Sequence, residues 1–133
     1  ALYLANKYDL KAVLINPAVN PAGSLDRYEG VDFVTNYYDN SRFEFNQNHI
    51  KSLKNYEVNF IKNPENFITL LQEDDEVLDF TEAATKLEET ELIIEEGGSH
   101  SFEDIERYFR GMHLRTEVHK RCGKLRTEAP HFH

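Results

Sequence analysis

Apolar runs and the polar segments between them predict three strands that alternate with helices. Continuous apolar stretches at residues 10–15 (LKAVLI) and 67–71 (FITLL) fit strands that are covered on both faces, and residues 91–95 (ELIIE) form a third candidate. A helical pattern over residues 2–8 precedes the first strand. Alternation of this kind is typical of βαβ units, so we expect an α/β fold in which helices flank a parallel sheet.

Capping signals locate the later helices. Asn, Asp and Ser side chains accept hydrogen bonds from the free amides of a first helical turn, and a Glu three positions on completes a capping box. By these signals, helices are expected over residues 47–55 after Asn46, from the capping box Asp79-Phe80-Thr81-Glu82 to about Leu87, and from Ser101 onward, with Ile105, Tyr108 and Phe109 on one face.

Composition and charge narrow the class of protein. A chain of 133 residues, 40% of them hydrophobic, suffices for one globular domain. The formal net charge is -9 and the 15 Lys and Arg residues are scattered. This argues against nucleic acid as a partner, because phosphate binding needs a basic face. No stretch resembles a membrane span or a secretory signal. One cysteine, Cys122, cannot form an internal disulfide, which favours a reducing cytoplasm.

Residues 111–133 differ from the acidic body of the chain, because they are basic, rich in histidine and without a clear apolar period. We therefore expect one domain over residues 1–110, followed by a loosely packed tail. Five His and Cys side chains in the tail are of a type that binds metals, but their spacing fits no closed tetrahedral site, so no metal is expected. They are His113, His119, Cys122, His131 and His133. A metal-binding tail on an inert domain is the alternative.

An acidic turn and a histidine loop follow consecutive predicted strands. Asp75 lies in the turn after residues 67–71, and His100 lies in the loop after residues 91–95. Parallel strands end at the same edge of a sheet, so both loops open where α/β proteins bind ligands. A carboxylate there accepts the histidine Nδ1–H and stabilises the imidazolium that forms when Nε2 takes a proton. The alternative is a solvated acidic turn beside an exposed histidine.

Asp74 and Asp79 are rival acids for this pairing. Asp79 has helix amides to cap, and Asp74 suits a turn, since aspartate tolerates left-handed backbone geometry. Gly97 and Gly98 let the backbone fold sharply before His100. Asp75 is therefore the expected partner of the histidine.

Four stretches carry a resemblance that covers residues 1 to about 109. They read AVLINPAV at 12–19, HIKSLK at 49–54, LLQEDDEVLDF at 70–80 and EEGGSHSFEDIERYF at 95–109. In this order they resemble the small bacterial YqiA-type esterases of the α/β-hydrolase superfamily, which end in an acidic turn, a helix, a strand and a histidine loop. The resemblance implies Asp75 as triad acid and His100 as base. It also implies an esterase that acts on acyl esters or thioesters without metal or organic cofactor.

The nucleophile of that family, a serine in a Gly-x-Ser-x-Gly-Gly elbow, has no counterpart in residues 1–133. No Gly-x-Ser-x-Gly occurs, and no serine of the chain follows a predicted strand in the required strand–turn–helix context; the serines are Ser24, Ser41, Ser52, Ser99 and Ser101. The helix over residues 2–8 starts without a cap, which suggests that sequence precedes Ala1 and carries the elbow. The chain is thus interpreted as the carboxyl-terminal part of an α/β-hydrolase, inactive alone. The alternative is a non-catalytic module that binds a small acyl ligand or a partner chain.

Two further expectations concern surfaces. By the same resemblance, residues 28–45 would form a lid whose aromatic side chains line an acyl pocket; ordinary core packing is the alternative for these aromatics. A sheet that lacks its preceding strands would leave the edge at residues 10–15 unpaired, so self-association through that edge is expected.

Overall fold

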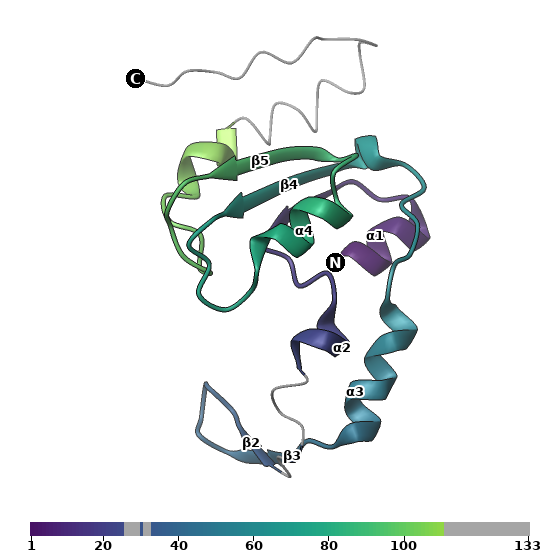
Figure 1. Cartoon of the computed structure of the whole chain (residues 1–133), viewed down its shortest axis with the longest axis vertical. Helices are drawn as coiled ribbons and strands as arrows, with labels where there is room; N and C mark the ends of the chain where they lie inside the picture. The colour runs from purple at the N-terminus through teal and green to yellow at the C-terminus, as the bar shows by residue number, and fades with distance from the viewer. Residues whose placement is uncertain (26–29, 31–32, 111–133) are drawn as a thin grey trace. The chain divides into compact units, whose positions relative to one another are not determined.

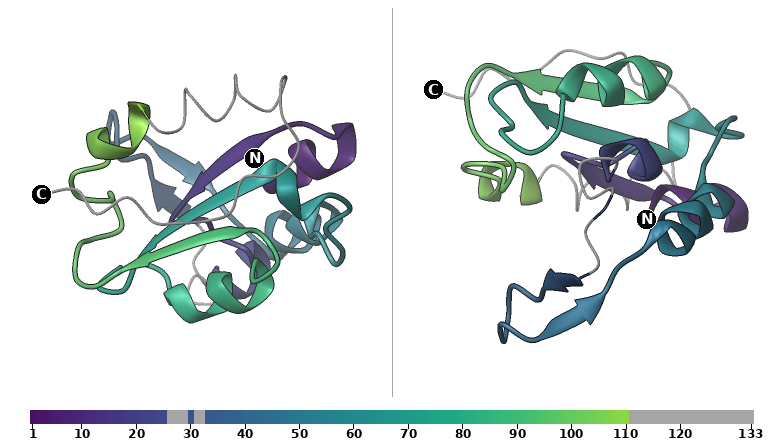
Figure 2. Two further views of the ribbon diagram at one scale, coloured as in Figure 1. Left: turned by 90° about the horizontal axis from the view of Figure 1, so that it is seen from above. Right: turned by 60° about the horizontal axis from the view of Figure 1, so that its bottom comes forward.

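A parallel three-stranded sheet organises the chain, as the sequence predicts. The structure is a computed structural model that describes residues 1–25, 30 and 33–110, and the chain divides into two compact units, Ala1–Glu103 and Asp104–His133. The sheet lies in the first unit and has the order β1-β4-β5, with β1 at Ala12–Ile15, β4 at Phe67–Gln72 and β5 at Glu91–Glu95. The three strands run side by side in both views of Figure 2.

The central strand β4 is almost wholly buried, because it has a neighbouring strand on each side and side chains packed on its faces. Ile15 of β1 is in register with Leu70, and Glu95 of β5 is in register with Gln72. All three strands are parallel, so their carboxyl ends lie at one edge of the sheet. This arrangement confirms the expected α/β fold.

Helices pack on the sheet through small and aliphatic residues. Ala5 of α1 (Leu2–Tyr8) and Ala83 of α4 (Phe80–Lys86) join one buried cluster with Phe67 and Leu71 of β4. Figure 1 shows α4 lying alongside β4 and β5. Burial of a large side chain such as Phe67 or Leu71 contributes about 1.5–3 kcal/mol, so this cluster stabilises the packing of the helices on the sheet.

The predicted caps Asn46 and Asp79 are confirmed, but among the contacts of the described residues none joins the Glu82 side chain to Asp79 as the expected capping box requires. Asn46 caps α3 (Gln47–Leu53) by accepting from the amides of Asn48 and His49, and the His49 ring accepts from the Asn46 amide in return. Asp79 caps α4 through the Thr81 amide and hydroxyl. Among the described residues of the first unit, there are three further short helical segments: α2 (Pro21–Ser24), η2 (Lys54–Tyr56) and η3 (Pro64–Asn66).

A two-stranded antiparallel hairpin occupies part of the segment expected to form a lid. It consists of β2 (Phe33–Thr35) and β3 (Arg42–Glu44), two strands that the sequence pattern does not predict. The ordinary core-packing interpretation is wrong for four of the aromatics there, because Phe33, Tyr37, Tyr38 and Phe43 are exposed. Residues 26–29, 31 and 32 lie outside the described residues, and the lid stays a prediction.

The expected helix start at Ser101 is wrong. Residues 101–105 form turns, and the described helix covers residues 106–110 in the second unit. Phe102 and Asp104 have φ values of 61° and 55°, in the left-handed region that no right-handed helix allows. The amide and carbonyl of Glu103 are bound to the Gln72 side chain, which takes them from any helix that would begin at Ser101.

Within the described residues, no helix has the length and apolar character needed to cross a bilayer. The expected tail over residues 111–133, with its five side chains of metal-ligating type, lies outside the described residues. So does the expected boundary between that tail and the domain before it.

Candidate active site

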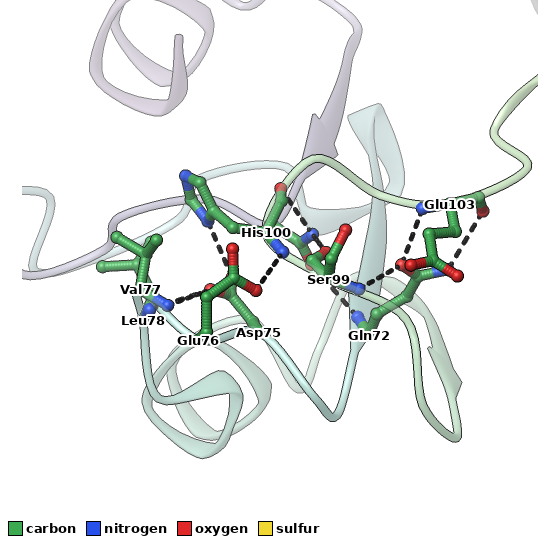
Figure 3. A network of polar contacts seen from close by, with 9 residues as sticks. Gln72, Asp75, Glu76, Val77, Leu78, Ser99, His100 and Glu103 are labelled. Atoms are coloured by element: carbon green, nitrogen blue, oxygen red, sulfur yellow. Dashed lines mark hydrogen bonds and ion pairs between the residues drawn. The ribbon is translucent and has the colours of Figure 1, made fainter.

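Asp75 and His100 form a hydrogen-bonded pair at the carboxyl edge of the sheet. The turn after β4 presents Asp75, and the loop after β5 presents His100. Nδ1 of the histidine lies 2.9 Å from Oδ2 of the aspartate. The Asp75 side chain is only 2% exposed, whereas that of His100 is 39% exposed. The carboxylate is therefore shielded while the ring remains open to solvent. Figure 3 shows the contact between the two side chains and the polar network around it.

The second oxygen of Asp75 is held by its own turn. Oδ1 accepts from the amides of Val77 and Leu78, each at 2.9 Å. Burial alone would raise the pKa of Asp75, but the bond from His100 and the two amide bonds outweigh it and lower the pKa of this carboxyl below its usual value. Asp75 is thus an anion with a fixed orientation. Its rival Asp79 is occupied in capping α4.

Glu76 also binds the histidine, through the main chain. Its Oε2 accepts from the His100 amide at 3.0 Å. Its own backbone amide, followed by the His100 amide, lowers the pKa of Glu76. Two consecutive carboxylates therefore hold one residue, Asp75 at the ring and Glu76 at the backbone. Sequence reasoning assigned no role to Glu76 and missed this contact.

Two buried amides, Asn16 and Gln72, connect the strand ends to the histidine loop (residues 96–103). The Asn16 amide group donates to the carbonyls of Ser99 and His100. Gln72 bonds to the amides of Ser99 and Glu103. Sequence reasoning missed both residues. The available signal was a polar residue at the end of each apolar run, since a buried amide must find partners.

An apolar cavity of about 310 Å³ adjoins the pair. Its wall is formed by loop residues after β1, by the turn after β4 and by the histidine: Asn16, Ala18, Pro21, Ser24, Leu25, Val77, Leu78 and His100. Within the described part of the chain, Nε2 of His100 forms no hydrogen bond. The histidine thus lines the cavity, and an oriented carboxylate contacts the Nδ1 side of its ring.

Three serine hydroxyls of the described residues, those of Ser24, Ser41 and Ser52, bond to groups a few residues away in sequence. Ser24 lines the same cavity as His100, but its hydroxyl donates to the Asn20 carbonyl at 2.9 Å. The backbone carbonyl of Ser99 accepts from Asn16, and its amide donates to Gln72.

Among the residues that the structure describes, no group of three or more His, Cys, Asp or Glu side chains is arranged to hold a metal ion.

The fold and this site together define the class: an α/β protein with an Asp–His pair at the carboxyl edge of a parallel sheet. Comparison with known families adds a more specific assignment. The family model described as "Uncharacterised protein family (UPF0227)" matches residues 1–114. The chain belongs to this family.

Proposed function

We propose that Asp75 and His100 are the acid and the base of a Ser–His–Asp triad in an esterase that hydrolyses acyl esters or thioesters. The observation that carries the proposal is the 2.9 Å Nδ1–Oδ2 contact between a covered carboxylate and a half-exposed imidazole. Membership of the UPF0227 family supports it through the resemblance of that family to YqiA-type esterases. The proposal places the chain in the carboxyl-terminal part of an α/β-hydrolase.

The chemistry follows from the orientation of the ring. Because Nδ1–H donates to Asp75, Nε2 carries the lone pair that takes a proton from an attacking serine hydroxyl. The serine oxygen adds to the ester carbonyl, and the imidazolium, stabilised by the carboxylate, then protonates the leaving alcohol or thiol. Water repeats the sequence on the acyl-enzyme and releases the acid. Residues 1–133 contain no elbow motif, so the proposal assigns the nucleophile and the oxyanion donors to sequence outside them.

The test compares the 133-residue chain with a longer protein that includes the natural coding sequence before Ala1. The longer protein should contain a Gly-x-Ser-x-Gly elbow, hydrolyse nitrophenyl esters and react with a serine-directed phosphonate. His100→Ala should abolish turnover but leave the elbow serine present. The short chain should show no burst of chromophore. A burst from the short chain, or a longer protein without an elbow, would overturn the proposal.

The cavity favours a second candidate function, a non-catalytic module that binds a small acyl ligand. Ala18, Pro21, Leu25, Val77 and Leu78 give the wall an apolar character that suits an acyl chain. Titration of the 133-residue chain with butyrate, followed by NMR shifts at these residues, tests it. Saturable binding by a longer protein that lacks ester turnover would favour this function over catalysis.

The outer edge of β1 is the candidate surface for self-association. Among the described residues no strand pairs with this edge, and Leu10 and Ile15 beside it are exposed. Unpaired apolar edges recruit other strands. Sedimentation of the 133-residue chain should show concentration-dependent oligomers, and Ile15→Lys should shift them toward monomer. A monomer at all concentrations would contradict this part of the proposal.

A further inference from the structure

We propose that Asn16, Gln72 and Glu76 are positioning residues that hold the histidine loop so that the His100 ring meets Asp75. The inference rests on the proposed function, because it concerns how that site is assembled. None of the three side chains bonds to the ring itself; each acts through the backbone of the loop. Gln72 and Glu76 contact the backbone of Ser99 before the histidine, of His100 itself and of Glu103 after it (Figure 3).

Asn16 joins three segments with one carboxamide. Its residue is only 5% exposed, and it lies directly after β1. Nδ2 donates to the carbonyls of Ser99 at 2.9 Å and His100 at 3.0 Å, and Oδ1 accepts from the Gln72 amide at 3.0 Å. Its φ of 40° is in the left-handed region, which asparagine adopts more readily than most residues. Asn16 therefore anchors the loop to the ends of β1 and β4 together.

Gln72 directs most of its carboxamide bonds to the same loop. Nε2 donates to Glu95 Oε2 at 3.0 Å and to the Glu103 carbonyl at 3.1 Å, and Oε1 accepts from the amides of Ser99 and Glu103. The loop backbone lies directly on this side chain, since a Cβ added to Gly98 would clash with the Gln72 carboxamide. Gln72 thus holds the histidine loop at Ser99 and at its last residue, Glu103.

Glu76 completes the arrangement from the acidic turn. Its carboxylate accepts from the His100 amide, whereas Asn16 donates to the His100 carbonyl. Both backbone groups of His100 are therefore bound by side chains. The pivot of the ring is fixed, and only its side-chain torsions remain to be set by Asp75. Loss of either backbone anchor should loosen the Nδ1–H bond to Asp75 and mix the two tautomers of the ring.

The test is a measurement of the His100 tautomer by imidazole ¹⁵N NMR in the 133-residue chain, at a mildly alkaline pH. Asn16→Gly removes the carboxamide but tolerates the left-handed backbone. The matched control is Asn40→Gly in the hairpin, where φ is 57°. Asn16→Gly should reduce the ratio of Nδ1–H to Nε2–H tautomers about tenfold, as loss of buried hydrogen bonds implies, and Asn40→Gly should leave it unchanged.

A second pair of variants changes an exposed residue, Glu76, and so leaves the buried core intact. Glu76 is exposed, so Glu76→Ala should fold normally and reduce the same ratio a few-fold. Glu76→Gln keeps an acceptor oxygen and should resemble the wild type. In the longer protein, Glu76→Ala should lower kcat with KM nearly unchanged, since the residue does not line the cavity.

Two results would overturn the inference: a wild-type tautomer ratio in a cooperatively melting Asn16→Gly variant, or equal ratios in Glu76→Ala and Glu76→Gln. If Asn16→Gly does not fold, the Glu76 pair decides alone. The tautomer measurement needs no turnover. The expected tautomer shifts in a longer protein that hydrolyses no ester would therefore overturn the proposed function and support the positioning inference.

Discussion

The candidate active site and the β2–β3 hairpin are both built from turns, yet different contacts stabilise them. In the hairpin, the backbone amide of Tyr38 donates to the side chain of Asn36. The amide and the hydroxyl of Ser41 donate to the side chain of Asp39, so each partner is two positions away. At the site, Asp75 binds a histidine 25 residues later, and Asn16 reaches a carbonyl 84 residues away. The contacts at the hairpin turn are thus local in sequence, whereas the site exists only when three strands have assembled.

The side chains of the hairpin turn and those of the candidate active site also differ in solvent exposure. Tyr37 and Tyr38 at the hairpin turn are 97% and 96% exposed, while the Asp75 side chain is almost fully covered. Substitution at a covered, multiply bonded group disturbs several partners, and substitution at an exposed side chain disturbs few. The two regions should therefore respond very differently to mutation and to pH.

The largest expected effect separates Asp75 from its neighbour Asp79. In a longer protein that carries the nucleophile, Asp75→Asn should lower kcat by about 10⁴-fold, because asparagine favours the wrong histidine tautomer. Asp79→Asn should change kcat little, since asparagine caps a helix nearly as well as aspartate. Steady-state kinetics on a nitrophenyl ester measures both. A reversed order of the two effects would refute Asp75 as the acid, although the hydrolase proposal would survive.

The second largest expected effect is on the free energy of unfolding, which should differ between a sheet variant and a hairpin variant. Leu71 of β4 is buried in the main cluster, so Leu71→Ala should lower the free energy of unfolding by about 2–5 kcal/mol. Tyr38→Ala in the hairpin should change it by no more than about 0.5 kcal/mol. Urea unfolding followed by circular dichroism measures both variants. A large loss for Tyr38→Ala would show that the hairpin turn is packed in solution against something else.

A smaller effect concerns pH. The pKa of Asp75 is lowered in the folded chain, so its contribution to stability is fully present above the unfolded value of about 3.9 and is lost as the pH falls through the folded value. Asp75→Asn should flatten the pH dependence of stability in this acidic range. Urea unfolding at a series of acidic pH values measures it. Identical curves for the wild type and Asp75→Asn would contradict the prediction.

The hairpin provides the control for this pH effect. The hydroxyl and then the amide of Ser41 lower the pKa of Asp39, which is fully exposed. Carboxyl ¹³C titration should show that His100→Ala raises the pKa of Asp75 and leaves that of Asp39 unchanged. Ser41→Ala should do the reverse. A response of both carboxyls to either variant would mean that the two regions are coupled.

The sequence alone determined the elements whose signals are local. Continuous apolar runs located β1, β4 and β5, and the caps Asn46 and Asp79 located two helices. The alternation of these elements predicted the parallel sheet, and parallel strand ends brought Asp75 and His100 to one edge. Hydrophobic periodicity and caps depend on neighbours within a few residues, so they can be read along the chain.

Tertiary structure decided which groups support the pair and where the last helix begins. The positions of Asn16, Gln72 and Glu76 against the histidine loop depend on strand register, which brings together residues far apart in the sequence. The helix signal at Ser101 failed for the same reason. The buried Gln72 carboxamide has to satisfy its hydrogen bonds, and it does so with the backbone of Glu103, which outweighs a local capping preference.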